Sequence, residues 1–163
     1  MSSKPIINHL KQASMRLEKY ELKKNPNKIA FEFTSEGPKG SILKGIYYSK
    51  IKFKGVSNLY NLAFGDKDKY SGQIDDQVIT DNQDREKVLS TVANTVIIFT
   101  THYPKAQIYF EGSNNARTRL YQMAISKYFD ELSENFNIKG YISKKWLPFE
   151  KNINYEAFLI TRK

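Results

Sequence analysis

The chain has 163 residues, of which 40% are hydrophobic and 26% are charged, and this composition predicts a single folded domain that spans residues 1–163. It contains no cysteine, which excludes disulfides, thiolate metal sites and a cysteine nucleophile. No segment resembles a signal peptide or a membrane span, so we expect a cytoplasmic protein, of a bacterial kind, that does not associate with a membrane.

The formal net charge of +9 is distributed unevenly along the chain. Residues 1–60 carry 12 Lys and Arg against 4 Asp and Glu, residues 61–100 carry 4 against 7, and residues 101–163 carry 10 against 6. A basic N-terminal third suits an anionic partner such as a nucleic acid or an acidic protein. The alternative is a solvated, lysine-rich surface without a partner.

The first half of the chain predicts one helix and three strands. Apolar residues at three- and four-residue spacing favour a helix within residues 6–20. Alternating apolar and polar residues favour a strand at 29–37, and the glycines and proline of residues 36–40 favour a turn that joins it to a second strand at 41–55. A third short strand is expected at 58–66, followed by a polar loop.

The second half alternates helices with strands. From residue 81 onward the apolar residues recur about every 3.6 positions rather than every second position, which predicts a long helix that ends just before Pro104. A buried strand at 106–112 follows, and a second helix is expected from Ser113 or Asn114 to Phe136. Two further strands are expected at 138–143 and 155–161. This order predicts an α/β (α+β) fold with a single mixed sheet, antiparallel in its first half, and helices packed on it.

Two arginines at the start of the second helix are candidate ligand-binding residues. At 100° per residue, Arg117 lies within about 40° of the centre of the apolar stripe and Arg119 about 160° from it. An inward arginine needs an anionic partner, and Glu111 and Glu156 are the candidate structural partners. Whether Arg117 pairs with either carboxylate or is free for a ligand is left open by the sequence.

A ligand is the other candidate partner of Arg117. A helix N-terminus carries partial positive charge, and Gly112 permits a ligand to approach the backbone. The candidate anion site comprises Gly112, Ser113, Asn114, Asn115, Arg117 and Arg119.

Two weaker groups of candidate binding residues occur in the first half of the chain. Lysines interleaved with aromatic residues favour a basic patch whose aromatic rings stack on nucleic-acid bases. The lysines of this patch are Lys44, Lys50, Lys52 and Lys54. A half-exposed strand without a nucleic-acid partner has the same pattern. One loop carries four carboxylates that could bind Mg²⁺, namely Asp66, Asp68, Asp75 and Asp76. They lack the spacing of a known metal motif, and no metal site is assigned to them.

Four blocks of the sequence resemble those of a bacterial protein family of unknown function. In chain order they are FEFTSEGPKGSILKGIYY, YNLAFGD, DNQDREKVLSTVAN and FEGSNNARTRLYQM. The resemblance covers nearly the whole chain and implies a single-domain cytoplasmic protein, without an activity.

The order of elements also resembles the GCN5-related N-acetyltransferase fold. NNARTRLYQMAISKYF is similar to the last core helix of that family, which implies that Asn114 or Asn115 would contact coenzyme A and that Tyr121 would be the general acid. Core packing also explains Tyr121, which lies on the apolar stripe. The family's glycine-rich pyrophosphate loop is missing here, and the first turn of the helix near residue 84 is acidic.

Three functions follow from these patterns. The favoured hypothesis is a non-catalytic binding module with a basic surface for an anionic partner. The alternative is a coenzyme A-dependent acyltransferase-like enzyme, and the third is Mg²⁺-dependent phosphoryl transfer or nuclease activity. The oligomeric state does not follow from the sequence, and neither does the choice between enzyme and binding protein.

Overall fold

The computed structural model describes residues 18–75, 77 and 80–163. Within these residues, nine strands form one sheet: β1 (Lys23–Lys24), β2 (Ala30–Gly37), β3 (Gly40–Lys50), β4 (Leu59–Lys67), β5 (Ile74–Asp75), β6 (Gln107–Phe110), β7 (Phe136–Ile142), β8 (Lys145–Pro148) and β9 (Ala157–Arg162). Three helices accompany them: α2 (Arg85–His102), α3 (Asn115–Lys127) and α4 (Phe129–Leu132).

The sheet has the strand order β1-β2-β3-β4-β6-β9-β7-β8, and β5 pairs with the end of β4. All neighbours are antiparallel except β4 and β6, which run parallel because α2 connects them as a crossover. The expected mixed sheet with an antiparallel first half is therefore confirmed. The tight β2–β3 hairpin is confirmed as well, with Gly37 paired to Gly40 and Gly40 at φ +88°.

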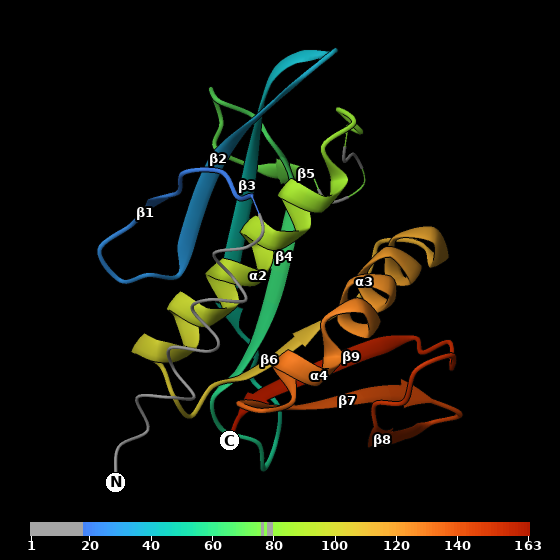
Figure 1. Cartoon of the computed structure of the whole chain (residues 1–163). Coiled ribbons are helices and arrows are strands. Elements are labelled where there is room, and N and C mark those ends of the chain that lie inside the picture. Colours follow the sequence, from blue (N-terminus) through green and yellow to red (C-terminus); the bar gives the residue numbers. More distant parts are fainter. Residues whose placement is uncertain (1–17, 76, 78–79) are drawn as a thin grey trace, which may run out of the picture.

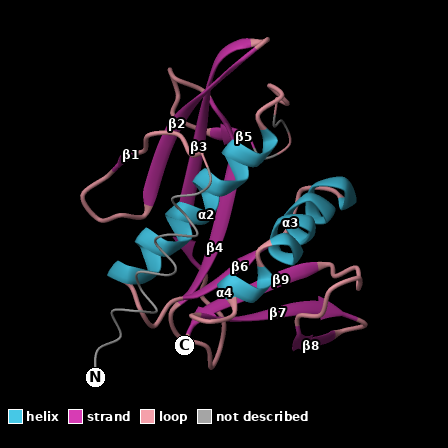
Figure 2. Cartoon of the chain, viewed as in Figure 1, coloured by secondary structure: helices cyan, strands magenta, loops and turns pink. Residues whose placement is uncertain are grey.

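The helices lie on one side of the sheet, with α2 over β3 and β4 and with α3 and α4 over β6, β9 and β7 (Figures 1 and 2). The core lies between these layers, because every second strand residue turns a large apolar side chain toward the helices. Tyr48 from β3 stacks on Phe99 from α2 with ring centroids 4.0 Å apart. Other buried members of this layer are Phe31, Phe33, Ile46, Phe64, Ile108, Phe110, Ile138, Phe158 and Ile160.

Two predicted helices differ from the structure. The helix expected as far as Phe136 ends at Lys127, because Tyr128 leaves the helical conformation; the short α4 follows, and Phe136 is a buried residue of β7. The helix expected within residues 6–20 lies outside the described residues, apart from Glu18, Lys19 and Tyr20, which have no regular secondary structure.

Candidate functional site

The parallel strands β4 and β6 separate part-way along β4. Their pairing covers Leu59 to Asn61, whereas β4 continues to Lys67 and β6 ends at Phe110. A cavity of about 140 Å³, which we call the strand notch, lies where they diverge. It is lined by Asn61, Leu62, Ala63 and Phe64 of β4, by Glu111, Gly112 and Ser113 after β6, and by Arg117 and Tyr121 of α3.

Gly112 allows the first turn of α3 to lie directly against the end of β6. A Cβ atom at this position would be 2.3 Å from the backbone nitrogen of Thr118 and 2.5 Å from the Cβ of Arg117. The Gly112 N–H donates to the Thr118 hydroxyl over 3.0 Å, and the Asn114 side chain caps the helix by accepting from the Arg117 N–H over 3.0 Å. These contacts place Arg117 at the strand notch.

Arg117 is a buried cation without a carboxylate partner among the residues that the structure describes. Its side chain is on the inward face, as the helical spacing predicts, and the residue is 9% exposed. Nη1 donates to the Ser113 hydroxyl over 3.0 Å. The guanidinium forms no ion pair with Glu111, Glu156 or any other described carboxylate, so neither candidate structural partner pairs with it. Burying this charge without a counter-ion is costly, and an anionic ligand would remove that cost.

Glu111 lines the same cavity but interacts with a tyrosine of β6. Burial raises the pKa of Tyr109, and the neighbouring Glu111 carboxylate raises that pKa further. The Tyr109 hydroxyl is protonated at neutral pH, as that of an ordinary tyrosine is, and can donate to Glu111. Sequence reasoning missed this role of Glu111, although its place two residues after Tyr109 on one face of a strand could have indicated it.

The remaining residues of the predicted anion site are only partly brought together. Ser113 lines the strand notch and holds Arg117, whereas Asn114, Asn115 and Arg119 are exposed and do not line it. The outward orientation predicted for Arg119 is confirmed. Asn61 of β4 lines the cavity and was missed, because only the strand register brings it opposite α3.

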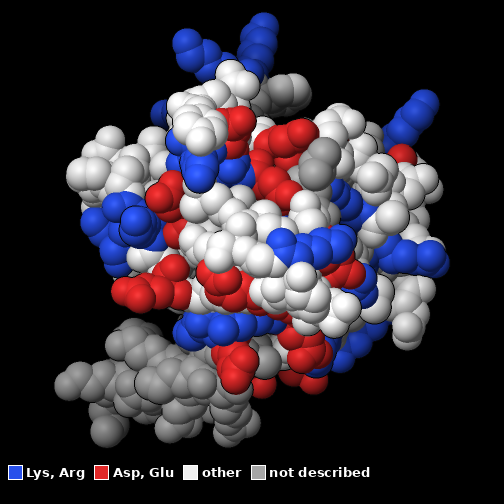
Figure 3. Space-filling model, turned by 90° about the horizontal axis from the view of Figure 1, so that it is seen from above, with Lys and Arg blue, Asp and Glu red and all other residues white. Residues whose placement is uncertain are grey.

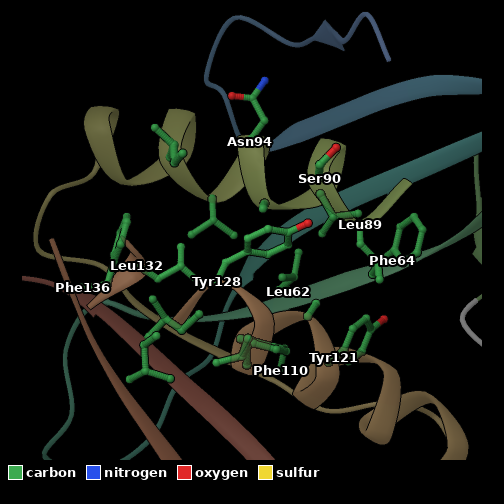
Figure 4. A pocket seen from close by; sticks show the side chains of 18 of the residues that line it. Leu62, Phe64, Leu89, Ser90, Asn94, Phe110, Tyr121, Tyr128, Leu132 and Phe136 are labelled. Carbon is green, nitrogen blue, oxygen red and sulfur yellow. The ribbon is translucent and has the colours of Figure 1, made fainter. Parts of the chain in front are cut away.

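A second cavity of about 140 Å³ lies between α2 and the α3–α4 segment, over the sheet (Figure 4). We call it the helix groove. Its helical walls are Leu89, Val92, Ala93, Val96 and Ile97 on one side and Tyr121, Ala124, Ile125, Tyr128 and Leu132 on the other. Leu62, Phe64 and Tyr121 line both the helix groove and the strand notch, so the two cavities adjoin.

Tyr121, the expected general acid of the acyltransferase hypothesis, is therefore at the junction of the two cavities. It is partly buried, and its ring packs edge-on against Phe110 with centroids 5.7 Å apart. This position agrees with the core-packing explanation, and it also makes Tyr121 part of the lining of both cavities.

The predicted basic patch is wrong at Lys44. This residue is fully buried, because it lies on the helix-facing side of β3, where its Nζ contacts Asp66 at 2.5 Å and the Thr80 carbonyl oxygen at 2.9 Å. Lys50, Lys52 and Lys54 are exposed, as expected. Lys52 and Lys54 follow β3 rather than belonging to it. The segment of residues 50–55, which we call the basic loop, also carries Phe53, which is 67% exposed.

Acidic and basic side chains are mixed on the face of the molecule that Figure 3 shows. On the face seen from above in Figure 3, both signs are interspersed and neither covers the face. Within the described residues, no group of three or more His, Asp and Glu side chains is arranged to hold a metal ion. Asp66, which the Mg²⁺ hypothesis used, accepts from Lys44 and from the Thr80 hydroxyl instead.

Among the helices of the described chain, none combines the length and hydrophobicity that crossing a membrane requires.

The sequence profile of the Family of unknown function (DUF6934) matches residues 16–163, and the chain therefore belongs to this family. The resemblance to a family of unknown function is thus confirmed. No curated protein matches the chain and no solved structure matches it, so these comparisons give no support to the acetyltransferase resemblance.

Proposed function

We propose that this protein is a binding module for an anionic ligand, and that the negative group of the ligand binds beside Arg117 in the strand notch. One observation carries the proposal: Arg117 is 91% buried, lines a cavity and has no carboxylate partner within the described residues. Guanidinium groups bind carboxylate and phosphate groups in a bidentate manner, and the N-terminal end of α3 adds a favourable dipole.

The test is isothermal titration calorimetry with acetate, inorganic phosphate, pyrophosphate and coenzyme A. We expect at least one of these anions to bind with 1:1 stoichiometry. Arg117→Gln should weaken that binding at least about tenfold, which corresponds to roughly 1.4 kcal/mol. Arg119→Gln is the matched control, because it removes the same charge from an exposed position of the same helix. The proposal is wrong if no anion binds, or if the two variants weaken binding equally.

The same titration addresses the acyltransferase alternative. The observation that favours the acyltransferase alternative is the position of Tyr121 at the junction of the two cavities, within reach of a ligand bound beside Arg117. Under this alternative coenzyme A binds saturably, and acetyl transfer from acetyl-coenzyme A to a primary amine falls by about two orders of magnitude or more in Tyr121→Phe. Coenzyme A binding without any turnover would leave the binding module as the function.

A nucleic-acid partner is the second candidate, and the basic loop favours it. An exposed aromatic ring flanked by two exposed lysines can stack on a base while the ammonium groups contact phosphates. Fluorescence anisotropy of labelled single- and double-stranded oligonucleotides over a salt series would test this function. Affinity should fall linearly with salt on a logarithmic scale, with a shallower slope in the double variant Lys52→Gln/Lys54→Gln.

The matched control for the oligonucleotide experiment is Lys144→Gln/Lys145→Gln. It removes the same charge from exposed lysines at the turn between β7 and β8. Equal losses in both double variants would mean that net charge, rather than the basic loop, attracts the oligonucleotide.

A further inference from the structure

The helix groove is a mostly apolar surface that adjoins the proposed anion site. Tyr121 and Phe64 lie at one end of the groove in Figure 4, and Leu132 and Phe136 lie toward the other. Three polar residues also line it, Ser90, Asn94 and Glu131, of which Asn94 turns its side chain away from the groove in Figure 4. Concave apolar surfaces of this kind are typical of ligand sites, because a ligand that covers them removes apolar area from water.

The charge of a candidate occupant determines whether it fits the helix groove together with the strand notch. An occupant that extends into the strand notch meets the guanidinium of Arg117, which has no carboxylate partner within the described residues, and an anionic end would supply that partner. The Glu111 carboxylate, which also lines the notch, interacts with Tyr109. Residues 1–17 contain three basic residues and no Asp or Glu, so this segment has no side-chain anion to offer. A small amphiphilic anion fits both cavities, because its charged group can lie beside Arg117 while its hydrocarbon chain lies in the helix groove.

We propose that the ligand is an unbranched amphiphilic anion, a carboxylate or phosphate on a hydrocarbon chain of medium length. This inference rests on the proposed anion site and adds the chemical class of its ligand. The α2 side of the groove extends from Leu89 to Ile97, a span of eight residue steps or about 12 Å of helix, which suits a medium chain. Tyr121 and Phe64, shared by the two cavities, contact the chain where it leaves the charged group.

The experiment is calorimetric titration of the full chain with acetate, octanoate and decanoate below their micellar concentrations. Burial of each methylene should tighten binding about fourfold, so decanoate should bind about tenfold more tightly than octanoate or better. Decyltrimethylammonium, which has the same chain and the opposite charge, should not bind measurably. Arg117→Gln should weaken all three carboxylates by a similar factor.

Ala93→Trp fills the groove without disturbing the core, because Ala93 is an exposed residue of α2 that lines the groove. We expect this variant to bind acetate normally and to lose the gain in affinity with chain length. His102→Trp, an exposed position of the same helix away from the groove, is the matched control and should retain that gain.

Four results would overturn the inference. Decanoate that binds no more tightly than acetate would show that the groove is not used, while the anion site itself would stand if acetate binding depends on Arg117. Equal chain-length dependence in Ala93→Trp and in the unchanged protein would place the chain elsewhere. Decanoate binding that appears only after Ile6→Ser/Leu10→Ser would assign the groove to residues 1–17. Failure of every anion, including acetate, would remove the proposed function as well.

Discussion

Two buried cations of this protein have opposite environments. Lys44 contacts Asp66 and the Thr80 carbonyl oxygen, so its charge is neutralised within the fold. Arg117 is buried to a similar degree, yet its guanidinium donates to a neutral hydroxyl, that of Ser113. A neutralised pair contributes to the structure, whereas a cation without a counter-ion costs stability that a ligand can restore.

Lys44→Met should lower the free energy of unfolding by about 3 kcal/mol, because it leaves the Asp66 carboxylate in a partly buried site without its cation. Urea denaturation followed by circular dichroism measures this loss. The double variant Lys44→Met/Asp66→Asn should recover part of it, since the orphaned charge is gone.

The pair of Lys67 with Glu32 provides the comparison for Lys44. Its atoms are 2.9 Å apart, but both side chains are more than a fifth exposed. Lys67→Met should therefore cost less than about 1 kcal/mol. Equal losses at the two lysines would contradict the assignment of Lys44 as the buried, neutralised cation.

At the scale of elements, Tyr48 joins β3 to α2. Its ring is stacked on Phe99, and its hydroxyl is 2.8 Å from the Thr95 hydroxyl within the core. Burial raises the pKa of Tyr48 above its ordinary value, so the phenol stays neutral in the folded protein over a pH range in which it ionises in the unfolded chain.

The raised pKa of Tyr48 predicts a loss of stability in alkali. Its contribution is fully present below about pH 10, the pKa of an exposed tyrosine, and is lost as the pH rises toward the folded-state pKa. The free energy of unfolding should therefore fall above pH 10 by up to about 1.4 kcal/mol per pH unit from this residue.

Tyr48→Phe isolates this contribution. It should cost about 1 kcal/mol at pH 7 through the lost hydrogen bond and should make the decline above pH 10 shallower. Tyr47→Phe, at a 43% exposed position of the same strand, is the control. Urea denaturation at intervals between pH 8 and about 11 measures both slopes; an unchanged slope in Tyr48→Phe would refute the prediction.

At the scale of the whole molecule, the sheet has two parts that meet at the parallel seam of β4 and β6. Only three residue pairs form this seam, from Leu59 to Asn61. A second link crosses between the parts, because Arg162 of β9 donates to the Thr100 and Thr101 hydroxyls and to the Ile97 carbonyl oxygen near the C-terminus of α2. A cation at this helix end is favoured by the helix dipole.

Arg162→Met should weaken this second link. We expect a loss of about 1–2 kcal/mol in the free energy of unfolding and faster hydrogen exchange in the last turn of α2. Lys163→Met removes a charge from the exposed neighbouring residue and should change neither quantity appreciably. Uniformly faster exchange throughout the sheet, without enhancement at α2, would argue against a local role of Arg162.

Local pattern was sufficient for much of the architecture. The alternation along β2, the glycine turn before β3 and the long apolar stripe of α2 all depend on neighbours in the sequence, and each appears in the structure. The inward orientation of Arg117 followed from helical spacing for the same reason. The end of α3 did not, because the apolar spacing continues past Tyr128 while the chain changes to β7.

The candidate site depended on contacts between residues far apart in the sequence. The burial of Lys44 required the register of β3 against β4, and the lack of an ion pair between Arg117 and any described carboxylate required the positions of Glu111 and Glu156 in space. The strand notch and the helix groove adjoin only because β4, α2 and α3 converge there. Periodicity reports which face of an element is apolar, but only packing decides what that face meets.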